Sequence, residues 1–261
     1  MVVRFLYRFR AIGAAAFSIG AFLLLWHFGT DGTELGKMMP GPWTVISGIF
    51  DTFSNPIGRH SILGHIGWSL SRVMVGYALA VIAGVSIGIF MGWSKIAAAV
   101  INPIYQMIRP IPPIAWIPLA ILWFGLGESG KYFLIFLASF NNITLNAYDG
   151  ARSADKTLIG ASKMLGANDI QTLFTVVLPS SVPAIFAGLQ VAVSVAWATV
   201  VAAEMVRSTE GVGWIIINGQ EMNDTTQILI GIVAIGVIGF LLAVIMRKLE
   251  DILCKWSKSG R

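Results

Sequence analysis

The chain alternates long apolar runs with short polar segments. A bilayer core roughly 30 Å thick is crossed by about 20 apolar residues in a helix, and six runs of this kind can be drawn. They cover about residues 11–28, 66–93, 97–123, 132–147, 184–203 and 228–246. Since only helices and closed barrels satisfy their backbone in lipid, the pattern predicts an all-α membrane protein with six transmembrane helices.

Before and after the first run, the polar and apolar positions follow two further patterns. Basic residues open the chain, as in a signal peptide, but the apolar run that follows is longer than usual and ends in WHFGTDG without a small-x-small cleavage site. We therefore expect an uncleaved span. Beyond it, Pro42 precedes apolar residues in one-sided helical spacing, which predicts a helix lying in the membrane interface: Trp43, Ile46, Phe50 and Phe53.

The second and third runs differ in character. The second carries small residues at every fourth position, which let helix backbones approach closely in lipid: Gly76, Ala80, Gly84, Gly88 and Gly92. The third contains prolines that interrupt a helix: Pro103, Pro110, Pro112, Pro113 and Pro118. Since broken backbone at membrane depth is tolerated only inside protein or beside a watery cavity, the third run is expected to face something other than lipid.

Composition agrees with a membrane protein. Hydrophobic residues make up 56% of the chain and charged residues 12%, against about 25% charged residues in soluble domains. The single cysteine, Cys254, cannot form an intrachain disulfide. Three scattered histidines have no acidic or cysteine neighbours at ligand spacing, so we expect no metal site.

The basic residues predict the orientation. With a cytoplasmic amino terminus, the inside segments hold Arg4, Arg8, Arg10, Lys95, Arg152, Lys156, Lys163, Arg247, Lys248, Lys255, Lys258 and Arg261. The outside segments hold only Lys37, Arg59, Lys131 and Arg207. This asymmetry of roughly three to one favours cytoplasmic termini. The net charge of +5 is thus a topology signal, and no nucleic-acid partner is expected.

A polar segment, residues 156–179, separates the fourth and fifth runs. Its first ten residues predict a short helix with Leu158, Ala161 and Leu165 on one face, ended by a left-handed turn at Gly166. Asn168 or Asp169 can cap a second helix that runs toward 179. An ordinary loop between spans is the alternative on composition alone.

The spacing of this segment resembles the coupling loop of ATP-binding-cassette (ABC) importer permeases, E-A-A, three residues, G, nine residues, I, one residue, L-P. Here Gly160-Ala161-Ser162 is followed at that spacing by Gly166, Val176 and Leu178-Pro179. RPIPPIAWIPL at 109–119, WFG at 123–125, NAY at 146–148, AAEM at 202–205 and GVG at 211–213 look like the nitrate, sulfonate and taurine branch. Gly160 replaces the usual glutamate, so coupling is expected to rest on shape and apolar contact.

The resemblance implies a type I ABC importer permease fold in a bacterial inner membrane. The expected parts are a span with an outside interfacial segment at 1–63, a permease domain at 64–246 with its coupling loop at about 151–180, and a cytoplasmic amphipathic tail at 247–261, in which Leu249, Ile252, Leu253 and Trp256 share a face. It also implies a chain that is no enzyme and binds no cofactor. ATP and magnesium then belong to two cytoplasmic ATP-binding subunits, and the other partners are a second permease copy and an extracytoplasmic substrate-binding protein.

Two sets of site residues are expected. The resemblance assigns coupling to Leu158, Gly160, Ala161, Ser162, Leu165, Gly166, Leu178 and Pro179. Basic residues within spans are costly in lipid, and side chains there that can offer hydrogen-bond donors could line a watery path. The candidates for the translocation pathway are Arg72, Arg109, Asn141, Asn142, Asn146, Trp197 and Thr199. Snorkelling of the arginines and amide contacts between helices stay open as alternatives, and Glu204 suits gating or ion pairing.

A stretch at 125–132, GLGESGKY, nearly satisfies the nucleotide P-loop pattern. No strand precedes it, the topology puts it outside, and Tyr132 stands where a hydroxyl ligand for magnesium is needed. We expect no nucleotide site here.

The expected function is import of a small anion such as nitrate, taurine or an alkanesulfonate, which Arg72 and Arg109 could attract. The same importer type with bicarbonate, an aromatic acid or a vitamin precursor as cargo stays open. A secondary transporter is disfavoured, because no inverted halves or mid-membrane carboxylates are visible. A membrane-embedded enzyme lacks a nucleophile with its base.

Overall fold

The structure is a computed structural model that describes residues 2–206 and 208–254. Within these ranges the chain forms helices and no named strand, so the all-α prediction is confirmed. The chain divides into two compact units, Met1–Gly64 with Ile215–Val233, and His65–Trp214 with Ala234–Arg261. The predicted division at 63/64 and 246/247 stays a prediction.

The first unit contains α1 (Val2–Thr30), α2 (Glu34–Met38) and α3 (Pro42–Ser54). The indole of Trp26 donates to the carbonyl of Pro40 at 3.2 Å, which ties the end of α1 to the start of α3. Pro42 lies in the first turn of α3, where its missing N–H costs nothing. Trp43 is 66% and Phe50 69% exposed, so α3 is a helix that presents apolar side chains outward. That it lies in the membrane interface stays a prediction.

The second unit is built around α4 (Ile62–Trp93), α7 (Glu128–Arg152) and α10 (Leu178–Val206). The glycines of α4 pack on α7: a Cβ on Gly76 would lie 2.7 Å from Ile135, and one on Gly88 would lie 2.6 Å from Ala147. Close backbone approach within the subunit is therefore the use of these small residues.

The third apolar run is broken, as its prolines predicted. It consists of α5 (Lys95–Ile108), the 3-10 turn η1 (Pro113–Trp116) and α6 (Ile117–Phe124). The two halves are bent by 85°. Pro110 and Pro112 lie in the break, because neither can continue a helix.

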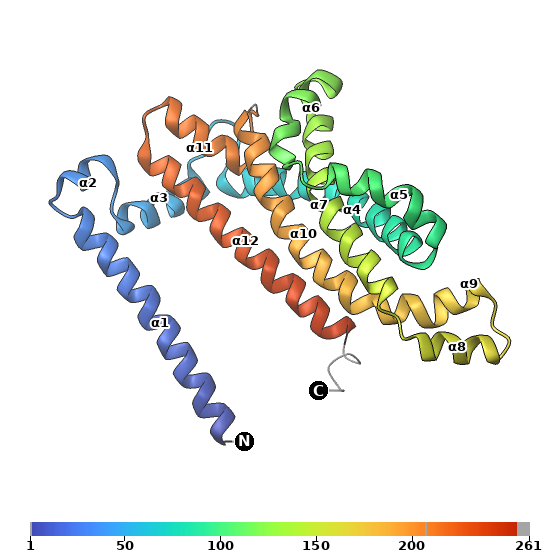
Figure 1. The fold of residues 1–261 in the computed structure, drawn as a ribbon. Coiled ribbons are helices and arrows are strands. Elements are labelled where there is room, and N and C mark those ends of the chain that lie inside the picture. The colour runs from blue at the N-terminus through green and yellow to red at the C-terminus, as the bar shows by residue number, and fades with distance from the viewer. Residues whose placement is uncertain (1, 207, 255–261) are drawn as a thin grey trace. The chain divides into compact units, whose positions relative to one another are not determined.

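Two short helices, α8 (Lys156–Met164) and α9 (Asp169–Thr172), connect α7 to the π-helical turn η2 (Leu173–Val177) and α10. Figure 1 shows them as a hairpin at the yellow part of the chain. The chain ends in α11 (Val212–Glu221), which the apolar pattern did not predict, and α12 (Thr225–Leu253). α12 runs unbroken through 247–253; Trp256 of the expected tail lies outside the described residues.

Four helical segments are long and apolar enough to cross a membrane: Gly13–Thr30, Ile62–Trp93, Asp169–Val206 and Thr225–Leu253. The bent pair Lys95–Ile108 and Pro113–Phe124 makes a fifth if it counts as one span. α7 has 25 residues, enough to cross at about 1.5 Å per residue, but it carries three asparagines and falls outside this set. Six spans and cytoplasmic termini stay predictions.

Candidate functional site

The helical hairpin, residues 155–177, is folded by local signals at each end of α8. Asp155 caps the helix by accepting a hydrogen bond from the Thr157 backbone N–H at 2.7 Å. That hydrogen bond lowers the pKa of Asp155 below its ordinary value of 3.8, so the cap is charged at neutral pH. α8 ends at Gly166, whose φ is +88°.

The turn after α8 is a Schellman motif. Gly166 N–H donates to the Lys163 carbonyl and Ala167 N–H to the Ser162 carbonyl, both at 3.0 Å. Asn168 then forms a reciprocal capping box with Gln171 at the start of α9. The predicted helix, turn and second helix are confirmed, with Asn168 as the cap.

Side-chain contacts hold the two short helices together. The hydroxyls of Ser162 and Thr172 are 3.1 Å apart, and Thr172 is fully buried. Lys163 Nζ lies 2.9 Å from the Asp169 carboxylate. Ser162, which departs from the usual alanine, therefore braces the hairpin. Gly160 has open space around its would-be Cβ, so nothing in the hairpin itself excludes a side chain there.

The hairpin presents large apolar side chains outward. Their exposed fractions range from 55% to 89%: Leu158 55%, Met164 84%, Leu165 89%, Ile170 69% and Phe174 62%. Its inner side packs into a core shared with α4, α7 and α10, which contains Ile89, Ala151, Val177 and Ile185, with Ile159, Leu173 and Leu178 partly buried against it. Gly166 and Pro179 are exposed and Ala161 is half-buried. An exposed apolar surface on a buried anchor is typical of a protein-binding site.

A buried ion cluster surrounds Arg72 in α4, which is only 1% exposed. Its guanidinium donates to both carboxylate oxygens of Glu128, at 2.6 and 2.8 Å. It also donates to Glu204 at 2.8 Å and to the Glu210 carbonyl at 3.0 Å. Lys131 Nζ adds a second cation on Glu128 at 2.8 Å. These carboxylates neutralise the charge of Arg72. The attraction of a passing anion by Arg72 stays a prediction.

Two further donors hold Glu204, which is 1% exposed. Ser69 Oγ donates to it at 2.8 Å and accepts from Val212 N–H at 2.9 Å. Gly213 N–H donates to the same carboxylate at 3.0 Å. A Cβ on Gly211, whose φ is +111°, would overlap that carboxylate. Glu204 thus makes the ion pair that the sequence allowed, whereas Glu128 and Glu210 were not anticipated as partners of Arg72.

Four of the expected pathway residues line two adjoining recesses. Arg109, Asn141 and Asn142 face one of about 170 Å³. Thr199 lines the other, of about 180 Å³, and both recesses share Pro113 and Val195. The break between α5 and η1 therefore lies beside polar side chains of α7. A route for solute here stays a prediction.

Besides Arg72, two expected pathway residues remain, Trp197 and Asn146, and both are engaged in contacts between or within helices. Trp197 is 4% exposed and its indole donates to the Ile235 carbonyl of α12 at 3.0 Å. Asn146 donates to the Asn142 carbonyl one turn earlier at 2.8 Å. The Trp197 contact joins two helices, as the alternative had it, whereas the Asn146 bond stays within α7.

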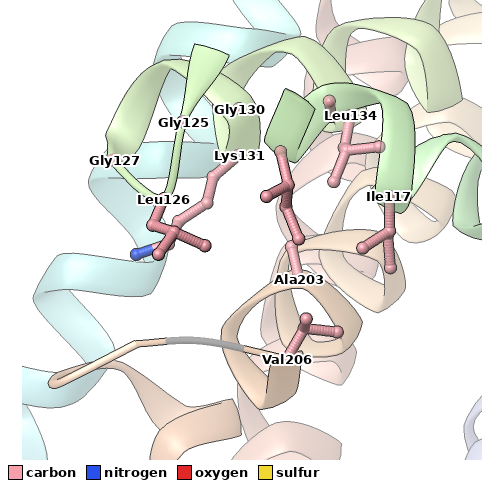
Figure 2. A pocket seen from close by; sticks show the side chains of 11 residues that line it. Ile117, Gly125, Leu126, Gly127, Gly130, Lys131, Leu134, Ala203 and Val206 are labelled. Atoms are coloured by element: carbon pink, nitrogen blue, oxygen red, sulfur yellow. The ribbon is translucent and has the colours of Figure 1, made fainter. Parts of the chain in front are cut away.

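The stretch 125–132 forms the turn between α6 and α7, at 125–127, and the first residues of α7, at 128–132. Figure 2 shows Gly125, Leu126, Gly127 and Lys131 around a recess with Ala203 and Val206 of α10. The recess is only about 30 Å³, space for roughly two water molecules. Lys131 Nζ, which a P-loop would aim at phosphates, instead contacts Glu128 and Ser208.

Comparison with known proteins identifies the family of this chain. Residues 80–256 match the family described as "Binding-protein-dependent transport system inner membrane component". The taurine transport system permease protein of Escherichia coli K12 is 36% identical over 220 residues, 84% of this chain and 80% of that protein. The nitrate import permease protein of Synechocystis is 31% identical, over 91% of this chain and 88% of that protein.

Two more comparisons agree. The putative aliphatic sulfonates transport permease protein of Bacillus subtilis 168 is 32% identical over 91% of this chain and 85% of that protein. A chain of the inward-facing MetNI methionine ABC transporter superimposes with a TM-score of 0.62, over 81% of this chain and 97% of that chain, at 16% identity, which shows a common fold. The chain therefore belongs to the family of binding-protein-dependent transport system inner membrane components, the permeases of ABC importers.

Proposed function

We propose that this chain is the transmembrane permease subunit of an ATP-driven importer for a small anion of the nitrate, taurine or alkanesulfonate class. A binding protein outside the membrane delivers the solute. A second permease copy completes the pathway, and two cytoplasmic subunits hydrolyse ATP. The names of three relatives, for taurine, aliphatic sulfonates and nitrate, support this range of cargo.

The observation that carries the proposal is the exposed apolar surface of the helical hairpin. Leu165 and Met164 are more than four-fifths exposed although both are large and apolar. A groove on an ATPase subunit would bury them, at about 25 cal/mol per Å² of apolar area. The hairpin core with α4, α7 and α10 then carries movement of the ATPase into the spans. Such coupling needs an element with two states, and both ATP and the solute must shift the balance between those states.

The topology proposed with this function has six spans and cytoplasmic termini. α7 is the most polar of the six, which suits a helix lining a route rather than facing lipid. Arg109, Asn141, Asn142 and Thr199 supply polar groups along the adjoining recesses. The Arg72 cluster joins α4, α7 and α10 near their outer ends and acts as a rigid tie.

Reconstitution into liposomes tests the proposal. The permease with its ATPase subunits and binding protein should take up labelled taurine, nitrate or an alkanesulfonate only when ATP is present on the ATPase side. Liposomes that hold the permease without ATPase subunits are the control. Uptake by that control, driven by an ion gradient, would instead establish a secondary transporter. ATP-dependent uptake of bicarbonate or an aromatic acid alone would keep the importer and replace the cargo.

A further inference from the structure

A basic recess lies where α4, α5, α7 and α8 meet, apart from the exposed apolar surface of the hairpin. Its volume is about 500 Å³, several times that of the recess around Arg109. Three cationic side chains line it, Lys95, Arg152 and Lys156, together with Tyr148. No acidic side chain lines it among the described residues.

The three cations have no carboxylate partner within the part of the chain that the structure describes. Arg152 donates to the Tyr148 hydroxyl at 3.0 Å and lies 5.3 Å from the centre of its ring, which orients the guanidinium without neutralising it. Three uncompensated positive charges around one cavity repel each other. An anion in the recess would relieve that repulsion.

Two of the three cations lie at helix starts, where a positive charge is unfavourable for helix stability. Lys95 and Lys156 are the first residues of α5 and α8, and neither helix has an acidic residue in its first turn. Cations in a first turn oppose the helix dipole by about 0.3–1 kcal/mol each. At the start of α8 the charged cap Asp155 offsets Lys156, but α5 has the uncharged cap Ser94. Lys95 therefore weakens its own helix, which is understandable if it binds an anion.

The surroundings of the recess indicate a lipid. One wall of the recess is apolar and consists of Met91, Trp93 and Ile159. Trp93 is the last residue of α4, and aromatic residues gather at such span ends at a membrane surface. From Lys95 onward α5 exposes an apolar stripe, Ile96 at 80%, Val100 at 63% and Ile104 at 60%. The stripe lies on the side of α5 opposite the recess-lining Lys95 and Ala98, so the acyl chains of a bound lipid would meet the apolar wall of the recess.

We propose that this recess binds the phosphate of an anionic phospholipid headgroup in the cytoplasmic leaflet. The leaflet follows from the topology of the proposed function, whereas binding itself depends only on the recess. Lys95, Lys156 and Arg152 contact the phosphate, Trp93 and Tyr148 lie at headgroup depth, and the acyl chains leave past the apolar wall of the recess. A bound lipid thereby joins the start of α8 to the ends of α4 and α7.

The test is a lipid titration of the purified full-length permease, without ATPase or cargo, followed by native mass spectrometry. We expect phosphatidylglycerol to bind and phosphatidylcholine not to. K95Q/K156Q should weaken phosphatidylglycerol binding about 25-fold, because each basic residue near a membrane surface contributes about 1 kcal/mol, or fivefold. K95R/K156R, which keeps both charges, should bind like the parent and shows that the site is folded.

R247Q/K248Q is the matched control, because it removes two exposed charges from the same predicted side at the end of α12. It should leave phosphatidylglycerol binding within about twofold. Equal weakening by both double variants, or equal binding of the two lipids, would overturn the proposal. Displacement of phosphatidylglycerol by millimolar inorganic phosphate would overturn it in favour of a soluble phosphate.

Addition of the ATPase subunits distinguishes a protein occupant. If the recess holds lipid, phosphatidylglycerol stays bound in the assembled complex, and K95Q, which changes α5 outside the hairpin, does not change ATPase affinity. Loss of the lipid on assembly, with weaker ATPase binding by K95Q, would identify acidic side chains of the ATPase as the occupant and contradict the proposal. Because these measurements use no solute uptake, they can fail while the proposed transport function stands.

Discussion

At the scale of single residues, Arg72 has the most consequential surroundings. Its guanidinium is 1% exposed and joins Glu128 and Glu204, from α7 and α10. Buried ion pairs contribute little net stability, but loss of one partner leaves the other charge uncompensated. The cluster is therefore far more sensitive to removal of one member than to removal of a matched pair.

Arg72→Gln should destabilise the permease by about 3–5 kcal/mol, measured by thermal unfolding in detergent. R72Q/E204Q should recover part of that loss, because the most buried carboxylate is removed with its partner. Lys37→Gln breaks the exposed pair with Glu34 and should change stability little. An R72Q protein as stable as the parent would refute the role of a structural tie.

Gly160 is a residue where the usual charge of the coupling motif is missing and can be restored. Its would-be Cβ meets nothing within 4 Å, so Gly160→Glu should fold normally. It should also stabilise α8 by about 0.5–1 kcal/mol, because glycine is a poor helix former. ATP hydrolysed per solute transported should stay unchanged. A large gain in coupling would mean that the missing glutamate charge matters after all.

At the scale of elements, the helical hairpin depends on its turn. Gly166 has a φ of +88°, a region that costs a side-chain-bearing residue about 1–2 kcal/mol. Gly166→Val should misplace α9 relative to α8 and uncouple ATP hydrolysis from uptake, as assayed in proteoliposomes. Gly160→Ala, at a helical glycine with free space around it, is the control. Normal uptake by G166V with normal assembly would contradict the role of this turn.

The exposed apolar face of the hairpin makes a separate prediction. Leu165→Ser and Phe174→Ser should each weaken ATPase binding about tenfold, since about 1.5–3 kcal/mol follows from burial of one such side chain. The stability of the isolated permease should hardly change, because both residues are exposed. Met222→Ser removes an equally exposed side chain after α11 and should leave ATPase affinity unaltered. Pull-down with the ATPase subunits measures all three.

The hairpin could be predicted residue by residue because its signals are local. A glycine at 166 and a cap act on neighbouring backbone: the turn formed at Gly166 as predicted, and the cap is Asn168, one of the two residues that the sequence left open. The Arg72 cluster could not be predicted in this way, because Glu128 is 56 and Glu210 is 138 residues distant in sequence. A buried arginine signals that acids must be near, but only the fold identifies them. α11 is short, at ten residues, and carries no long apolar run.

At the scale of the whole molecule, α7 decides the topology. Its ends carry Glu128 and Arg152, and its middle carries asparagines, so hydropathy alone does not establish it as a span. Its neighbours constrain it nevertheless, since its buried face packs on α4 glycines and on the hairpin core. We expect a helix of this length that is packed between two apolar spans to cross with them, and its polar groups would then be sheltered from lipid.

Site-directed labelling tests that crossing. Leu126 and Ser153 are exposed residues just before and just after α7. L126C should react with a membrane-impermeant maleimide in intact cells, and S153C only after permeabilisation, because the proposed topology puts the two ends on opposite faces. The native Cys254 is 1% exposed, so unmodified protein provides a low background. Labelling of both positions from the same side would remove α7 from the spans and reverse the orientation of every segment after it, including the helical hairpin.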